Sequence, residues 1–401
     1  MNTFVIAVFV AVYLGMLLGG IPGLRVDRTG IALVGAIVLL AGGGISEQAA
    51  LESLDVPTLA LLFGLMIVSA QFELGGFYQE VTHIVGDMQV SPPALLAAVV
   101  AVTGLLSAIL TNDVVCLAIA PLLASTCLRK GLDPVPFLLG LACASNVGSA
   151  ATLIGNPQNI LIGESMDLSF TGYLWRALPV TVINLGIVWA VVVRLQRGRW
   201  VQETRQSVPD PVPFDRFQTG KGVVVLTVLI VGFVFTDIPR ELLAMSCAAF
   251  LLLSRRFHSS RIVGLVDWQL IVLFVSLFVI NAAFQATGGM DTLVSALSDR
   301  GIRLESPSVM FVTTAVLSNL VSNVPAVMLM LPLAKGTDAG LLLALSSTLA
   351  GNLIVVGSVA NIVVLTAARG QGVNISAWTH AKVGVPVTLA TLAVAALFLF
   401  V

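Results

Sequence analysis

Two short polar blocks interrupt long apolar stretches of this sequence. The first block holds Ser107, Thr111, Asn112, Asp113 and Pro121, and the second holds Ser318, Ser322, Asn323 and Pro332. In both blocks the Ser lies five residues before the Asn, and the Pro nine residues after it. Amides and hydroxyls both donate and accept hydrogen bonds, which suits them to contact a polar solute or an ion. Paired interruptions at matching points of two apolar halves predict a membrane transporter whose binding site lies at an internal repeat.

Each block is followed by a second interruption of the same kind. In the first half it contains Ser145, Asn146, Gly148, Gly155, Asn156 and Asn159, and in the second half Asn352, Gly357, Ser358 and Asn361. The Gly and the last Asn are four residues apart in both copies. We expect the first interruption to begin at 145–149 and to continue to 155–157. Non-helical backbone at membrane depth is tolerated only where it is buried in protein or lines a cavity, so these residues are candidate binding residues.

The interruptions predict a pocket for a small anion or another polar solute. Opposed half-helices would direct N-terminal N–H groups, carrying roughly +0.5 charge each, toward a common point. Loop carbonyls and helix C-termini nearby suit a small cation. For a single Gly or Ser, the alternative role is close helix packing.

Asp113 is the one carboxylate that we predict deep in the membrane. A charged residue there costs about 2.5–3.5 kcal/mol on insertion scales, which makes it a functional candidate by default. It could take up a proton or hold a cation, or it could cap the returning helix. Its counterpart in the second block, Val324, has no polar side chain, so the two half-sites are chemically unequal.

The composition places the chain in a membrane. Hydrophobic residues make up 57% of 401 residues and charged residues only 10%, against about 25% charged in soluble domains. No basic cluster indicates nucleic acid, and no catalytic or metal-binding motif indicates an enzyme or a cofactor. The four cysteines are expected to be apolar filler, although a thiol site for a soft ion is conceivable. The three histidines, among them His380, lie near predicted span ends, so we expect them at the interface.

We predict an all-α integral membrane protein with about ten transmembrane helices and two re-entrant hairpins. The expected spans are 3–21, 29–44, 56–72, 136–162, 173–195, 222–236, 240–254, 267–286, 341–367 and 383–401, with hairpins at 92–128 and 306–334 and broken helices at 136–162 and 341–367. Residues 1–195 and 222–401 would form two repeats, joined by a polar linker at 196–221. Five full spans per half is an odd number, so the two copies would have inverted orientations.

Basic residues support this topology. With both termini outside, 15 of the 20 Lys and Arg residues fall on the cytoplasmic side, together with the linker 196–221. This bias depends on each hairpin leaving the membrane on the side where it entered. We therefore expect a multi-pass protein of the cell (inner) membrane.

At these motifs the chain resembles the ion transporter superfamily, which includes arsenite permeases, citrate and dicarboxylate/sodium symporters, the pink-eyed dilution protein and D-type sodium/proton antiporters. Thr111-Asn112-Asp113 and Ser322-Asn323-Val324 look like the Ser-Asn-Thr hairpin tips of the dicarboxylate branch. The run from Gly155 to Asn159 looks like the Gly-Thr-Pro-Pro-Asn of that branch. The run from Gly357 to Asn361, together with Asn112-Asp113, looks closer to the arsenite permeases.

The resemblance implies an ion-coupled secondary transporter that moves its substrate by an elevator-like shift. Carried over residue by residue, it implies a sodium site at Ser107, Asn112 and Gly155, and a second at Asn323 and Gly357. Val324 stands where that second motif has a hydroxyl, so the coupling ion is either sodium or a proton. The protein is expected to be a homodimer. The rival interpretations are a sodium/proton antiporter and an efflux subunit that works with a separate soluble ATPase.

Overall fold

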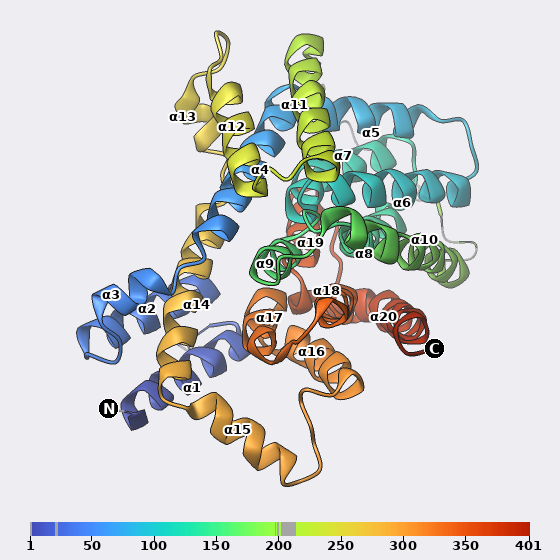
Figure 1. Cartoon of the computed structure of the whole chain (residues 1–401). Coiled ribbons are helices and arrows are strands. Elements are labelled where there is room, and N and C mark those ends of the chain that lie inside the picture. Colours follow the sequence, from blue (N-terminus) through green and yellow to red (C-terminus); the bar gives the residue numbers. More distant parts are fainter. Residues whose placement is uncertain (1, 21–22, 197, 199, 202–213) are drawn as a thin grey trace.

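The computed structural model describes residues 2–20, 23–196, 198, 200–201 and 214–401, which are almost entirely helical (Figure 1). Within these ranges the only β feature is an isolated bridge between Leu132 and Val201. The helices of the first half are α1 (Asn2–Leu18), α2 (Arg28–Ala41), α3 (Glu47–Glu52), α4 (Val56–Leu74), α5 (Phe77–Asp87), α6 (Pro92–Ile109), α7 (Asn112–Arg129), α8 (Pro134–Ser149), α9 (Pro157–Ser165) and α10 (Phe170–Leu195).

The second half repeats this order of elements. It contains α11 (Arg216–Phe235), α12 (Arg240–Leu252), α13 (Ser259–Val263), α14 (Trp268–Ala286), α15 (Gly289–Ser298), α16 (Pro307–Val321), α17 (Asn323–Met330), the 3-10 turn η1 (Leu331–Leu333), α18 (Thr337–Ala350), the 3-10 turn η2 (Val355–Gly357), α19 (Val359–Gly370) and α20 (Ala377–Phe400). The first half has a break between α8 and α9, and the second half has one between α18 and α19.

Matching residues begin matching helices. Asp55 caps α4 by accepting from the Thr58 N–H, and Asp267 caps α14 by accepting from the Leu270 N–H. A side-chain acceptor at this position satisfies one of the free N–H groups of the first turn. Before α5 and before α15 the chain turns through a glycine with positive φ, Gly76 at 72° and Gly288 at 70°, a conformation that a side chain would disfavour.

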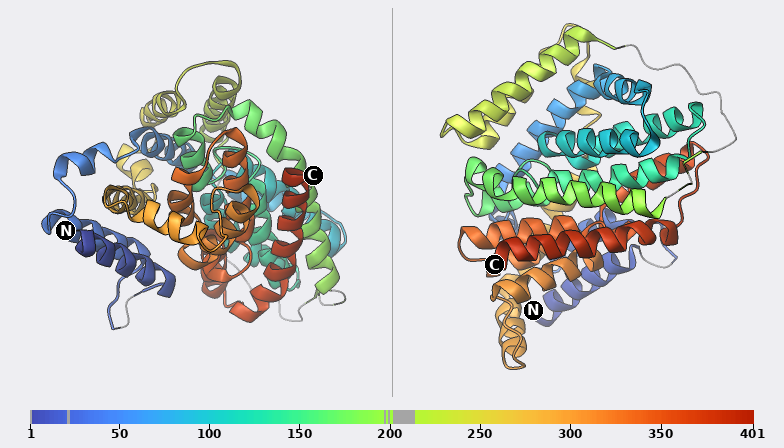
Figure 2. Two further views of the ribbon diagram at one scale, coloured as in Figure 1. Left: turned by 60° about the horizontal axis from the view of Figure 1, so that its bottom comes forward. Right: turned by 90° about the vertical axis from the view of Figure 1, so that its right-hand side faces the viewer.

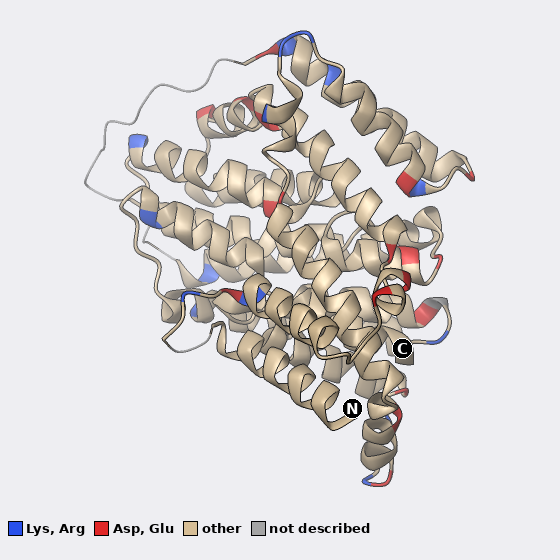
Figure 3. Ribbon diagram, turned by 90° about the vertical axis from the view of Figure 1, so that its left-hand side faces the viewer, with Lys and Arg blue, Asp and Glu red and all other residues tan. Residues whose placement is uncertain are grey.

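Seven of the described helices are long and apolar enough to cross a membrane: α4, α6, α7, α10, α11, α14 and α20. Several shorter apolar helices accompany them. Charged residues gather at helix ends and in connections, while the middle stretches of the bundle carry almost none (Figure 3). Large apolar side chains such as Leu105, Val224 and Leu389 remain more than 60% exposed. Such a surface matches lipid rather than water, so the chain is a multi-pass membrane protein.

The two halves interleave rather than sitting side by side. Helix α4 of the first half packs along α12 of the second, and α14 of the second packs along α2 of the first (Figure 1). Gly64 of α4 approaches the backbone of Ala244 so closely that a Cβ built there would lie 2.8 Å from the Ala244 carbonyl carbon. On the other side of the molecule α6 packs on α8, α16 packs on α18, and α10 runs beside α20 (Figure 2).

Three of the expected boundaries that differ from the structure have a local cause. Helix α11 begins at Arg216, inside the expected linker, because Asp215 caps it through the Phe217 and Gln218 N–H groups. Helix α20 begins at Ala377 rather than 383, because Ser376 caps it. The first interruption begins after Ser149 rather than at 145, because the side chains of Ser145 and Asn146 point across to neighbouring helices and leave the backbone of α8 helical.

Candidate functional site

A cluster of buried amides lies where helices of both halves meet. Asn146 on α8 accepts from the Asn112 amide at 3.1 Å and from the Ser358 hydroxyl at 2.8 Å. Its own amide donates to Asn352 Oδ1 at 2.8 Å and to Asn361 Oδ1 at 3.2 Å. All five residues are at most 4% exposed. We call this group the central amide network; it joins α7 and α8 to the α18 break and the start of α19.

The turn between α6 and α7 is held against this network by its backbone. The Asn112 N–H donates to the Gly155 carbonyl at 2.9 Å, across the break between α8 and α9. The Ser145 hydroxyl donates to the Asn112 carbonyl at 3.2 Å. Gly155 packs closely against the backbone of Ser107 and of Ser149. A Cβ at this position would lie 2.8 Å from the Ser107 carbonyl oxygen and closer still to that of Ser149. Only glycine allows this approach.

The break between α8 and α9 connects to the second half through a further chain of polar contacts. Asn156 caps α9 by accepting from the Asn159 N–H at 2.9 Å, and its amide donates to the hydroxyls of Ser149 at 2.8 Å and Thr348 at 3.2 Å. The Asn159 amide donates to the Tyr173 hydroxyl at 3.2 Å, and that hydroxyl donates to the Ala150 carbonyl at 2.9 Å.

The turn between α16 and α17 occupies the corresponding place in the second half. With its amide nitrogen facing inward, Asn323 donates to the Gly357 carbonyl at 3.1 Å and to the Ser347 carbonyl at 3.2 Å. Ser322 adopts φ 82°, a strained value for a residue other than glycine, and such strain often accompanies functional turns. Asn112 and Asn323 therefore each bind the Gly of their own half's break, Gly155 or Gly357.

Several polar atoms around the two turns have no hydrogen-bond partner among the described residues. They are buried and comprise Ser107 Oγ, Thr111 Oγ1, Asn112 Oδ1, Ser318 Oγ and Asn319 Oδ1. Buried polar groups are normally paired, so a set of free hydroxyl and amide oxygens at two matching turns can accept a small cation or a polar solute. No cluster of three His, Cys, Asp or Glu side chains that could hold a transition metal occurs in the described ranges.

Gly148 and Asp113 are among the predicted site residues that make no contact in the central amide network. Gly148 faces away from it and contacts the backbone of Gly104 on α6, which is a helix-packing role. Asp113 lies in the first turn of α7, and its carboxylate faces the backbone N–H of Ala360 at the start of α19.

Sequence reasoning missed some members of the site. Thr348 and Tyr173 look like ordinary span residues, and only the packing of α18 and α10 brings them to Asn156 and Asn159. His380, which was expected at the membrane interface, lies in the first turn of α20 with its side chain fully buried in the protein. It occupies the position that Tyr173 has in the first half, four residues after the capping Ser. The matching positions of Tyr173 and His380 in the two halves are the sequence signal that could have located them.

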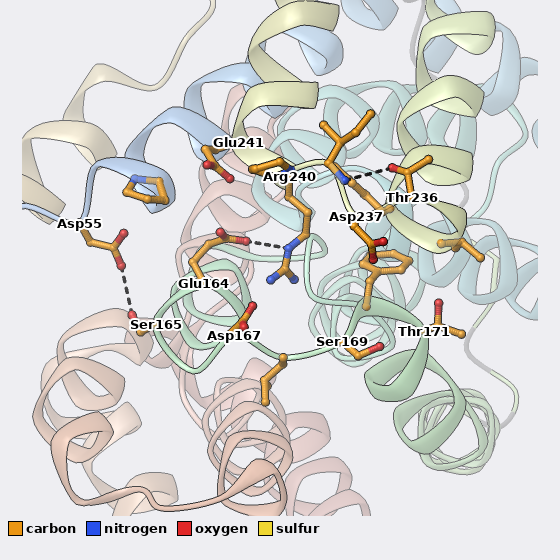
Figure 4. Close-up of a pocket in the computed structure, with 17 residues that line it drawn as sticks. Asp55, Glu164, Ser165, Asp167, Ser169, Thr171, Thr236, Asp237, Arg240 and Glu241 are labelled. Carbon is orange, nitrogen blue, oxygen red and sulfur yellow. Dashed lines mark hydrogen bonds and ion pairs between the residues drawn. The ribbon is translucent and has the colours of Figure 1, made fainter.

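A separate polar cavity of about 720 Å³ lies where α4, the α9–α10 connection and the α11–α12 connection meet (Figure 4). Its carboxylates come from Asp55, Glu164, Asp167, Asp237 and Glu241, with Arg240 as its one basic side chain. Arg240 Nε pairs with Glu164 Oε1 at 3.0 Å and its Nη2 donates to the Gly163 carbonyl at 3.1 Å. We call this cavity the acidic vestibule. Its ion pair ties the end of α9 to the start of α12.

Comparison with known proteins shows to which family this chain belongs. Residues 9–341 match the model of the citrate transporter family, which is most of the chain and includes both polar turns. The chain belongs to the citrate transporter family. It is accordingly a membrane transporter and not an enzyme, as the sequence indicated, and the resemblance to the ion transporter superfamily is confirmed.

Similar proteins match over nearly the full length of this citrate transporter family member. It is 28% identical to the 46 kDa membrane protein of Mycobacterium leprae, covering 100% of this chain and 98% of the relative. It is 27% identical to the silicon efflux transporter LSI3 of Oryza sativa subsp. japonica, with 93% and 92% covered. The inner membrane protein YbiR of Escherichia coli is 30% identical, over 80% and 82%. The YdaH transporter of Alcanivorax borkumensis, described as having an unusual topology, shares the fold at TM-score 0.56 and 16% identity, covering 99% and 97%.

Proposed function

We propose that this protein is an ion-coupled secondary transporter of a small anion or oxyanion, with its binding site at the central amide network. The observation that carries the proposal is that Asn146 joins Asn112, at the turn before α7, to three residues around the break between α18 and α19. Helices α7 and α19 begin at these contacts, and helix N-termini attract anions. Amide and hydroxyl groups complete a site that suits a small polar solute.

Two features support ion coupling. Sodium would fit between Ser107, Asn112 and Gly155, because the Ser107 and Ser149 carbonyls lie close to Gly155 and the Ser107 hydroxyl and Asn112 amide oxygens have no partner among the described residues. A proton is the alternative, with Asp113 as its carrier. No Arg or Lys belongs to the hydrogen-bond network, so helix dipoles would provide the positive potential.

We further propose that the two halves are inverted repeats and that α6–α7 and α16–α17 are re-entrant hairpins. The matching caps, breaks and turns support the repeat, and the distribution of basic residues supports the hairpins and the external termini. The hairpins would move with α8–α10 and α18–α20 relative to α4, α12 and α14, as in an elevator. The acidic vestibule lies on the boundary between these groups of helices.

Two other functions have specific support. The name of the rice relative, a silicon efflux transporter, favours export of a small solute; an efflux subunit would work with a separate ATPase. A sodium/proton antiporter would use Asp113, but such a protein is expected to have more buried carboxylates.

Uptake into proteoliposomes separates these possibilities. Arsenite, phosphate, sulfate, citrate and succinate would each be offered under imposed sodium or proton gradients. Movement of one anion driven by one gradient supports the proposal. Sodium flux driven by protons with every solute absent selects the antiporter, and a lack of all flux selects a subunit that needs its ATPase.

We predict that Asn112→Ala and Asn323→Ala each abolish transport while the protein remains inserted and monodisperse. Asn112→Ala removes the amide that donates to Asn146, and Asn323→Ala removes the amide that donates to the Gly357 carbonyl, so solute and ion lose candidate ligands. The measurement is initial uptake rate per inserted protein. Ser246→Ala, which alters an exposed hydroxyl on α12, is the control and should transport at the wild-type rate. Normal uptake by both Asn variants would remove these turns from the site.

A crosslink tests the proposed movement. We expect Glu164→Cys with Arg240→Cys, joined by a short bifunctional thiol reagent, to stop transport, and cleavage of the link to restore it. The paired side chains lie on opposite sides of the proposed sliding boundary, 3.0 Å apart. As the control, Asp215→Cys with Arg256→Cys replaces an ion pair close to α11 and α12, and its crosslink should leave transport unaffected. Undiminished transport by fully crosslinked 164–240 protein would contradict the movement.

A further inference from the structure

An apolar groove of about 480 Å³ lies between α6, α8 and α10, behind the central amide network. Small residues line much of it, among them Gly104, Ala108, Gly148 and Ala151, which are buried. Leu105 and Val182 on its rim are 63% and 58% exposed. Both α6 and α10 are helices long and apolar enough to span a membrane, so the groove opens toward lipid.

The length of the groove matches one hydrocarbon chain. Along α6 it runs from Ala97 to Ala108, and along α10 from Leu178 to Trp189. Eleven residues at the helical rise correspond to about 16 Å. Half of a bilayer's hydrocarbon core is about 15 Å, which is the depth that one acyl chain fills.

One end of the groove has the features of a membrane interface. Trp189 is 38% exposed there and its indole N–H donates to the Pro93 carbonyl at 2.9 Å. Tryptophan is enriched at the level of lipid headgroups. The far end, near Ala108 and Leu178, carries no charged side chain.

Basic side chains gather at the same end as Trp189. Lys130 donates to the Met88 carbonyl at 3.5 Å, just before α6 begins at Pro92. Arg194 lies in the last turn of α10, beyond Trp189. Lysine and arginine at this level complement a lipid phosphate. Thr181 is the one hydroxyl in the wall; it is 3% exposed and has no partner among the described residues.

We propose that this groove holds one acyl chain of an anionic phospholipid, with the phosphate near Lys130 and Arg194. The chain would fill the hollow that the small residues leave and cover the contact between Gly104 and Gly148. A lipid in this position rests directly on α8, the helix that carries Asn146. The proposal requires membrane insertion but not any particular substrate or coupling ion.

Filling the groove provides the test. Gly186 lines the groove, and a Cβ built there meets nothing within 4 Å, so Gly186→Leu adds a side chain to the groove wall without straining the backbone. The matched control is Gly220→Leu on α11, where a Cβ likewise meets nothing. The full chain, purified with phosphatidylglycerol present, would be examined by native mass spectrometry. We expect one tightly retained phosphatidylglycerol on the wild type and on Gly220→Leu, and none on Gly186→Leu.

Two further measurements keep the proposal falsifiable. A phosphatidylglycerol with a photoreactive acyl chain should label residues 97–108 and 178–189. Lys130→Gln with Arg194→Gln should reduce retention of phosphatidylglycerol relative to phosphatidylcholine. Equal retention by wild type and Gly186→Leu, no retained lipid on the wild type, or labelling confined to other helices would each overturn the assignment.

Discussion

Asn146→Ala is expected to reduce transport by at least about two orders of magnitude, because it removes the residue on which both halves converge. Four partners lose their contact at once: Asn112 and Ser358 lose an acceptor, and Asn352 and Asn361 lose a donor. Each buried group left unpaired costs about 1–3 kcal/mol. The apparent melting temperature of the purified protein should therefore fall as well. Uptake rate per folded protein, measured with thermal stability, checks both effects.

A second buried asparagine provides a control that distinguishes loss of the site from loss of packing alone. Asn184 on α10 is fully buried, and its amide donates only to the Thr391 carbonyl at 3.5 Å. We expect Asn184→Ala to lower stability modestly and to leave transport close to that of the wild type. If Asn146→Ala behaves in the same way, retaining transport once protein amount is corrected, the central amide network is only structural.

Gly155→Ala is the second change with a large expected effect. The added methyl carbon would overlap the Ser149 carbonyl and lie 2.7 Å from the Ser149 Cα and 2.8 Å from the Ser107 carbonyl. Because all three contacts are backbone, no side-chain rotation can relieve them, and such overpacking typically costs about 1–3 kcal/mol. The break must shift, and the 2.9 Å bond from the Asn112 N–H to Gly155 breaks with it. We expect transport to be lost in vesicles that contain normal amounts of protein.

The control for this variant is Gly220→Ala, since a Cβ there meets nothing within 4 Å. Alanine also has a better helix propensity than glycine by about 1 kcal/mol, so this variant should be as active and slightly more stable. Wild-type transport by Gly155→Ala would mean that the close approach of Gly155 is not needed for binding. Retained ion binding in a variant that cannot transport would place the defect in movement instead.

Much of this architecture could be predicted from local patterns. Apolar runs predicted where the long helices lie, and the paired Asn, Gly and Ser motifs predicted the turn before α7 and the break after α18 that meet at Asn146. Caps such as Asp55 and Asp267 could be read from their position before apolar runs. These features depend on residues close in sequence, which is why they can be predicted from the sequence alone.

The parts that were not predictable depend on tertiary packing. Gly148 has the same local signature as a ligand-lining glycine, and only the crossing of α6 and α8 shows that it contacts Gly104. Thr348 reaches Asn156 across 192 positions of sequence. His380 lies in a helix that begins six residues before the expected span, and only the packing around α20 shows that its side chain is buried. Hydropathy also cannot reveal the acidic vestibule, because three connections that are distant in sequence supply its carboxylates.

The interleaving of α2 with α14 and of α4 with α12 has a consequence for how the protein is made. During synthesis, α2 and α4 enter the bilayer long before their partners exist, and the closely fitting backbone of Gly64 has nothing to fit against until Ala244 has left the ribosome. The early helices must therefore remain in lipid, or be bound by an insertion chaperone, without their packing partners. Assembly is complete only when α12 has packed against α4 and α14 has packed against α2.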